Sequence, residues 1–172
     1  NDSGGAGYPY ICTINESGTV TNTYQTDTLS NGSNNPVILT NDNEIYVVGG
    51  NDSSSEWWIR EFDYDTFSFT GNKWDLTDTL DGKISFTPNN FSGTEECVLY
   101  CPRINKIVVI GEGQPIANTP VDKYKVIFDP VTKTTSWDGN RIWGTKAMVA
   151  FAFDSSTNTF FIAVDDGLGV SV

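Results

Sequence analysis

The segment Asn43–Trp74, NEIYVVGGNDSSSEWWIREFDYDTFSFTGNKW, decides how the rest of the chain is interpreted. It opens with an apolar run, Ile45–Val48, that leads into the pair Gly49-Gly50. A polar loop, a second apolar run over Trp57–Phe62, an Asp-rich turn and a third run ending at Trp74 follow. Short runs of β-branched and aromatic residues between turn-forming residues are typical of strands. The segment therefore predicts successive β-strands joined by short connections.

The same order of features returns at Asn105–Trp137. The apolar run 45–49 aligns with 107–111, and that run aligns with 160–164. Repeats of four strands with periods of about 50 residues are a signature of β-propeller blades. No window keeps a 3.6-residue apolar period, so no helix is expected. The other expected strands are Tyr8–Ile14, Thr19–Gln25, Val37–Leu39, Lys83–Phe86, Glu96–Cys101, Tyr124–Phe128, Lys133–Trp137, Ala147–Phe153, Thr159–Val164 and Gly167–Val172.

The order of apolar strand, glycine pair, strand, Asp-x-x-Thr turn and Trp resembles the kelch repeat of β-propellers. The resemblance covers about two thirds of the chain and implies an all-β fold of four-stranded antiparallel blades. In the second unit Glu112 replaces the second glycine, and the third unit lacks the glycine pair. The matching residues are Gly49, Gly50, Asp63 or Asp65 and Trp74 in the first unit, and Gly111, Asp129, Thr132 and Trp137 in the second.

The blade-like units do not close a ring by themselves. Residues 1–172 form one predicted domain with units at about 36–80 and 95–143, and half-units at 8–25 and 147–172. Propellers typically have four to eight blades. Either the chain is part of a longer propeller, or the half-unit of one molecule completes that of the next, giving a ring or filament. Because the chain begins with Asn1 rather than Met, it is expected to be a processed form or a piece of a longer chain.

The charge balance excludes several partners. The formal net charge is −12 and the pI about 4.1, so nothing would neutralise nucleic-acid phosphates. The longest apolar run, Ala147–Phe153, is far shorter than a membrane span. We therefore expect no nucleic-acid partner and no membrane insertion.

The composition gives no catalytic site and no cofactor. Histidine is absent, which removes Ser-His-Asp and Cys-His machinery and most zinc and copper centres. The plentiful carboxylates are expected to form turns and a solvated surface. Calcium is the one metal alternative, with Asp42, Asp63 and Asp65 as candidate ligands, because carboxylate oxygens suit this ion.

Aromatic, cysteine and asparagine residues provide further candidates. Trp57 and Trp58 are adjacent on a strand, so one ring should point inward and the other outward, where it could contact a sugar or a protein. A disulfide could join Cys12 to Cys97 or Cys101. Asn-x-Ser/Thr sequons in predicted loops suggest glycosylation of a secreted chain. The candidate sites are Asn15, Asn31, Asn51 and Asn90, with a further sequon at Asn1.

Three functions remain open. The leading one is a non-enzymatic, extracellular structural or adhesive module at a cell or virion surface, which self-assembles by sharing strands. The second is a propeller that binds glycan or protein through loops such as Asn51–Glu56 and Gln114–Val121. The third is a fragment of a larger propeller enzyme.

Overall fold

The computed structural model describes residues 10–25, 37–51, 56–76, 86–88, 98–113, 122–143, 147–154, 156–157, 159–165 and 170–171. Within these ranges every regular element is a β-strand and no helix occurs. All strand pairings are antiparallel. The prediction of an all-β antiparallel fold is confirmed, and none of the described sheets closes on itself.

The strands form a hairpin and three sheets that follow chain order. The N-terminal hairpin consists of β1 (Tyr10–Ile14) and β2 (Val20–Gln25). The first sheet contains β3 (Val37–Leu39), β4 (Ile45–Asn51), β5 (Glu56–Asp63) and β6 (Ser68–Asp75) in that order. The second contains β7 (Phe86–Pro88), β8 (Val98–Cys101), β9 (Lys106–Gly113), β10 (Asp122–Asp129) and β11 (Thr134–Trp143). The third contains β12 (Ala147–Asp154), β13 (Thr159–Asp165) and β14 (Val170–Ser171).

The second sheet differs from the predicted unit 95–143 in one respect. Two short strands share one edge of β9: β8 pairs with residues 106–109, and β7 pairs with residues 111–113. The expected strand Lys83–Phe86 is therefore placed slightly later in the chain, and the sheet begins before residue 95. The first sheet has the predicted four-stranded meander.

Equivalent turns recur in the first and second sheets. The turn between β3 and β4 places Asn43 at φ 59°, and the turn between β8 and β9 places Asn105 at φ 48°. Asn enters this left-handed region more readily than most residues. The turns that join β5 to β6 and β10 to β11 end on Phe67 at φ 50° and Lys133 at φ 56°. The two sheets therefore present corresponding residues at corresponding places.

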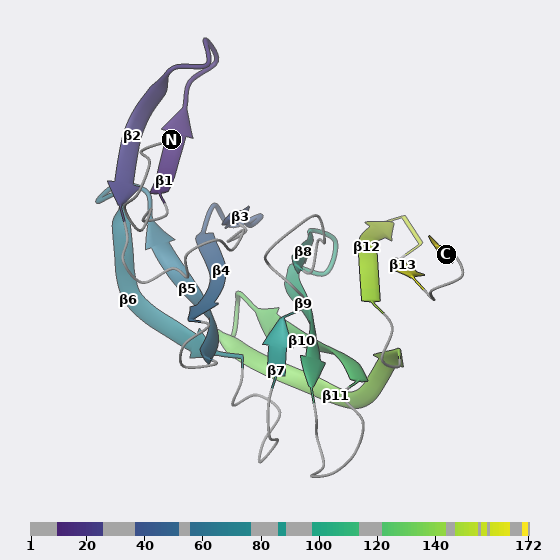
Figure 1. The fold of residues 1–172 in the computed structure, drawn as a ribbon. Helices are drawn as coiled ribbons and strands as arrows, with labels where there is room; N and C mark the ends of the chain where they lie inside the picture. Colours follow the sequence, from purple (N-terminus) through teal and green to yellow (C-terminus); the bar gives the residue numbers. More distant parts are fainter. Residues whose placement is uncertain are drawn as a thin grey trace, which may run out of the picture.

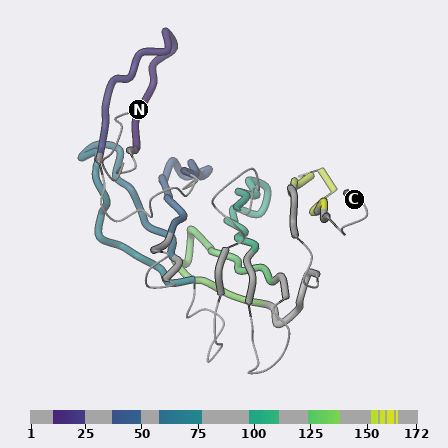
Figure 2. The backbone as a smooth tube through the Cα atoms, viewed as in Figure 1, coloured from purple at the N-terminus to yellow at the C-terminus, as the bar shows by residue number. Residues whose placement is uncertain are grey.

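The units stack in a curved row, with the hairpin at one end and the third sheet at the other (Figure 1). Figure 2 follows the backbone along this row from β1 to β13. One core lies between the first and second sheets and includes Tyr46, Val48 and Val126. A separate core joins the hairpin to the opposite face of the first sheet, where Val47 is buried. The alternation along β4 thus buries both of its faces, as expected for a strand between two layers.

The second sheet is also covered on both faces. Phe153 of β12 and Phe160 of β13 pack against its core, and their rings lie 4.8 Å apart. The guanidinium of Arg103 donates a hydrogen bond to the Ser156 carbonyl at 2.8 Å, which links the second and third sheets. Each unit therefore packs on the next through the same pair of faces.

Candidate association surfaces at the two ends of the row

The junction between the first and second sheets shows what a complete contact looks like. Phe128 of β10 is fully buried and receives two aromatic side chains from the first sheet. The ring of Tyr46 on β4 lies 5.1 Å from it, and the ring of Trp74 on β6 lies 4.9 Å from it. Aromatic pairs at these distances add about 0.5–1.5 kcal/mol each beyond burial. Side chains from the second and fourth strands of one sheet thus pack against the third strand of the next sheet.

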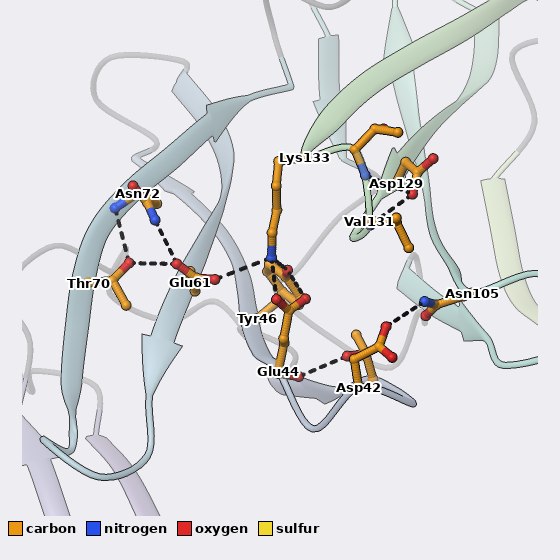
Figure 3. Close-up of polar contacts among 12 residues, drawn as sticks. Asp42, Glu44, Tyr46, Glu61, Thr70, Asn72, Asn105, Asp129, Val131 and Lys133 are labelled. Atoms are coloured by element: carbon orange, nitrogen blue, oxygen red, sulfur yellow. Dashed lines mark hydrogen bonds and ion pairs between the residues drawn. The ribbon is translucent and has the colours of Figure 1, made fainter.

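A polar cluster closes this junction at the turn end (Figure 3). The Lys133 ammonium, carried by the turn after β10, donates to Glu44 at 2.6 Å, to Glu61 at 3.3 Å and to the Tyr46 hydroxyl. Asn72 and Thr70 donate hydrogen bonds to the second oxygen of Glu61 at 2.7 and 3.0 Å. One cation therefore ties three side chains of the first sheet to the second sheet.

The pKa values in this cluster follow from its contacts. Burial alone would lower the pKa of Lys133, but its hydrogen bonds to Glu44 and Tyr46 raise that pKa above the ordinary value. Burial and the hydrogen bond to Glu44 raise the pKa of Tyr46. Burial opposes ionisation of Glu61, but donors including Asn72 hold its pKa below the usual range. The cluster is therefore a charged inter-sheet contact at neutral pH, and all its partners lie within the protein.

The turns add neutral contacts to the same junction. The Asn41 side chain donates to the Pro102 carbonyl at 2.7 Å, and the Asn41 backbone amide donates to the Tyr100 hydroxyl at 2.7 Å. Asn105 donates to the Asp42 carboxylate at 2.9 Å. These bonds fix one sheet against the next in a defined register.

At the N-terminal end of the row, the hairpin covers part of the first sheet. Phe62 of β5 holds the position in the first sheet that Phe128 holds in the second, because each pairs with the first residue of the apolar run, Ile45 or Ile107. Tyr24 of β2 lies 5.6 Å from the Phe62 ring in an edge-to-face contact. Phe62 thus receives one aromatic contact from the hairpin, as Phe128 receives one from β6.

Beside this contact the first sheet has an open depression of about 760 Å³. Val37 and Leu39 of β3 lie on its wall and are 54% and 60% exposed. An acidic rim of Glu44, Glu61, Asp63 and Asp65 surrounds this apolar floor, which Ile45 and Phe62 complete. Exposed apolar side chains gathered at one place commonly mark a binding surface.

At the other end of the row, one face and one edge of the third sheet have no packing partner among the described residues. Phe161 of β13 is 51% exposed, whereas its neighbour Phe160 packs back on the second sheet. β14 pairs only with Val164 and Asp165. Within the described residues, the remaining edge of β13, Thr159–Ala163, has no partner strand. An open edge of this kind is a template for another strand.

The structure places the calcium candidates apart from any cluster. Asp42 accepts the hydrogen bond of Asn105 across the sheet junction, and Asp63 accepts the Thr66 backbone amide at 2.9 Å inside its turn. Asp65 is exposed on that turn. Three or more metal-ligating side chains do not gather anywhere in the described ranges. Calcium binding at these residues remains a prediction.

The Trp and Cys candidates have distinct positions. Trp58 is 3% exposed in the core beneath the hairpin, so it is the inward member of the pair. The side chain of Trp57 lies outside what the structure describes. Cys12 is exposed and Cys101 buried, and both are free thiols, so the predicted bond between these two is absent. Cys97 lies outside the described residues.

Of the sequon residues, Asn15 is in the tip of the hairpin. Its side-chain oxygen accepts the backbone amides of Ser17 at 3.1 Å and Thr19 at 2.8 Å. Asn51 ends β4, and its side chain is not described. Asn1, Asn31 and Asn90 lie outside the described residues. Glycosylation at these positions stays a prediction.

Sequence reasoning missed the residues that build the junctions. Lys133 was expected to begin a strand, and neither it nor Glu44 was a candidate. Phe161 and Ile14 were expected only as strand residues. The available signal was the repeat itself, since Phe161 aligns with Tyr46 as the second residue of the apolar run.

Comparison of the chain with known protein families, curated proteins and solved structures finds no match to any of them. In the described part of the chain, no helix is long and apolar enough to cross a membrane. The features that bear on function are therefore the exposed apolar side chains and the open strand edge at the two ends of the row.

Proposed function

We propose that the protein is a non-enzymatic, extracellular structural module whose copies join head to tail by sharing strands. In this proposal the units are kelch-like propeller blades. The third sheet of one copy and the N-terminal hairpin of the next form one four-stranded blade, β12-β13-β1-β2. The contact uses different surfaces on the two copies, so repetition produces a ring or a filament.

The matching edges at the two ends carry this proposal. The open edge Thr159–Ala163 of β13 and the strand β1 are similar in length, and in the register given below four residues of that edge, Phe160–Ala163, pair with Ile11–Ile14 of β1. Within the described residues, β1 pairs on one side only, with β2. Joining the two would pair the backbone groups of these residues on both edges, as in other cases of strand addition. Figure 1 places β1 and β13 at opposite ends of the row, and in this proposal the partner strand of each comes from a second copy.

The turns predict which residues of β1 pair with which residues of β13 between copies. Asn15 begins the hairpin turn and accepts the amide two residues later, as Asp129 does in the second sheet. In the second sheet the residue before that turn, Phe128, pairs with Ile107. The corresponding pair between copies is Ile14 with Phe160. Antiparallel pairing then sets Cys12 opposite Ile162.

This register also accounts for an exposed apolar side chain. Ile11 of β1 is buried against the first sheet, so Ile14 lies on the opposite face of the same strand. Ile14 is 62% exposed. In the shared blade it takes the position of Phe128 and packs on the second sheet of the neighbouring copy.

Cross-linking tests the register directly. We expect Ile162→Cys to form covalent oligomers with Cys12 of a second copy under a mild thiol oxidant, because opposed antiparallel residues lie within disulfide reach. The bond forms between two thiols, and the oxidant takes up the two electrons and two protons. Ala163→Cys, one residue out of register, is the matched control, and Cys12→Ser combined with Ile162→Cys should abolish the product. Sedimentation should show concentration-dependent growth of the unmodified protein. A monomer at all concentrations, or equal cross-linking at 162 and 163, contradicts the proposal.

A further inference from the structure

The depression on the first sheet corresponds to a contact that is filled elsewhere in the molecule. At the junction of the first and second sheets, Phe128 receives Trp74 from the fourth strand and Tyr46 from the second strand. Among the described residues of the hairpin, Phe62 receives only the contact equivalent to Trp74, which Tyr24 supplies. The place where a Tyr46 equivalent would lie is the open depression beside Phe62.

The residue that corresponds to Tyr46 in the third sheet is Phe161. Tyr46 follows Ile45 in the first apolar run, and Phe161 follows Phe160 in the third. Tyr46 points forward, toward the next sheet, whereas Phe160 points backward, toward the preceding one. Because adjacent strand residues face opposite sides, Phe161 also points forward, where it is 51% exposed.

We propose that the depression lined by Val37, Leu39, Ile45 and Phe62 receives Phe161 of a second copy. This inference rests on the proposed strand sharing, which brings the third sheet of one copy over the first sheet of the next. It adds a specific anchor: one aromatic side chain in one apolar pocket. Aromatic anchors in desolvated pockets commonly dominate the energetics of protein interfaces.

A paired change in chemistry supports this assignment. At the internal junction the hydroxyl of Tyr46 is met by Lys133, the last residue of the β10–β11 turn. The equivalent turn residue in the first sheet is Phe67, which shares the same left-handed backbone conformation and lies 5.2 Å from the Phe62 ring. A Phe161 side chain has no hydroxyl and needs no cation. The polar pair Tyr46–Lys133 of the internal junction is therefore replaced by the apolar pair Phe161–Phe67 at the junction between copies.

The acidic rim predicts how substitutions at position 161 should differ. Glu44, Glu61, Asp63 and Asp65 surround the depression, and of these Glu44 and Glu61 are paired with Lys133. An incoming carboxylate would be repelled by the rim, whereas an incoming ammonium would be attracted. We therefore expect Phe161→Glu to weaken association more than Phe161→Lys does. A general loss of apolar contact would affect both alike.

The test measures association of the full chain by sedimentation velocity, with the Cys12 and Ile162→Cys cross-link as a second readout. Phe161→Ala should weaken association by about 30-fold or more, the loss expected when an interface anchor is truncated. Leu39→Asp should cause a comparable loss, and Val131→Ala, 69% exposed on a turn of the second sheet, should cause none. Circular dichroism confirms folding of each variant.

The outcomes separate the two proposals. If Phe161→Ala and Leu39→Asp associate as the unmodified protein does while the cross-link at 162 forms, the anchor is wrong and strand sharing stands. Equal effects of Phe161→Glu and Phe161→Lys also contradict the assignment of the acidic depression. If the unmodified protein does not associate and Ile162→Cys does not cross-link to Cys12, both proposals are overturned.

Discussion

The contact between the first and second sheets can be tested by replacing Phe128 with Ala. This side chain is fully buried and lies 5.1 Å from the Tyr46 ring and 4.9 Å from the Trp74 ring. If the two sheets form one cooperative unit, removing the ring should destabilise both. If they are independent, the first sheet should unfold as before.

The expected loss follows from burial. Truncation of a buried Phe to Ala typically costs about 3–5 kcal/mol, and the aromatic pairs with Tyr46 and Trp74 place this site in the upper part of that range. A small domain is stable by only about 5–15 kcal/mol, so we expect Phe128→Ala to unfold under mildly denaturing conditions. Phe128→Leu keeps most of the volume and should cost less, so it preserves a measurable folded state.

Urea denaturation followed by Trp fluorescence gives the free energy of unfolding of each variant. Val131→Ala, in the turn that follows Phe128, is the matched control and should change stability by no more than about 0.5 kcal/mol. A loss below about 1 kcal/mol for Phe128→Ala would refute the shared core. Two separate transitions in the unmodified protein would refute the cooperative unit.

Four further outcomes are expected. Deleting residues 1–25 should lower the urea midpoint and shift Trp58 emission to the red, since the hairpin covers that ring; unchanged emission would contradict the packing. Asn105→Ala should lower the free energy of unfolding by about 1–3 kcal/mol, because the variant loses the hydrogen bonds with Tyr100 and Asp42 and places Ala at a positive φ. Asn105→Gly removes the same hydrogen bonds without the backbone strain, so it should recover part of this loss in the same urea titration. Lys133→Met should cost about 1 kcal/mol, given the partial exposure of its ion pairs, and this difference should shrink in high salt; a salt-independent difference would argue for packing instead. The hydrogen bond from Lys106, with further donors in the turn, lowers the pKa of Asp129 to about 2, below its unfolded value of about 3.9. The contribution of Asp129 to the free energy of unfolding is therefore present above pH 4 and is lost as the pH falls toward 2. Asp129→Asn should flatten this part of the pH–stability curve measured by thermal unfolding.

Most strands could be predicted from the sequence because each is a short run of β-branched and aromatic residues between turn-forming residues. Val37–Leu39 was placed without error, and the strands around residues 45 and 107 were correct in type but short at their ends. The largest error was β11, expected to end at Trp137 but observed to continue to Trp143. Gly139 is a residue type common in turns, yet the strand continues past it, with register shifts between Tyr124 and Val126 of its partner β10. Glycine within a strand often accompanies such a bulge.

The candidate site was less predictable, because it depends on contacts between sheets. Lys133 and Glu44 are 89 residues apart, and no periodic pattern reports how one sheet rotates against the next. Trp58 illustrates the limit: alternation predicted one buried ring in the pair, and only the position of the hairpin decides which. The repeat predicted half-units at the two ends of the chain. Which residues of the two ends would pair with each other could be proposed only from the strand pairings and the burial of side chains in the structure.

The row of sheets, each packed on its neighbours, has a consequence for local stability. In the described part of the chain, the first and second sheets have packing neighbours on both faces, whereas the hairpin and the third sheet each have one face with exposed apolar side chains. In such a quasi-one-dimensional array, stability is approximately the sum of unit and nearest-neighbour terms. Amide hydrogen exchange should therefore be slowest near Val109 and Val126 and fastest in β1 and β13. Joining two copies would convert two fraying ends into one protected interior, so exchange at both ends should slow together as the assembly grows.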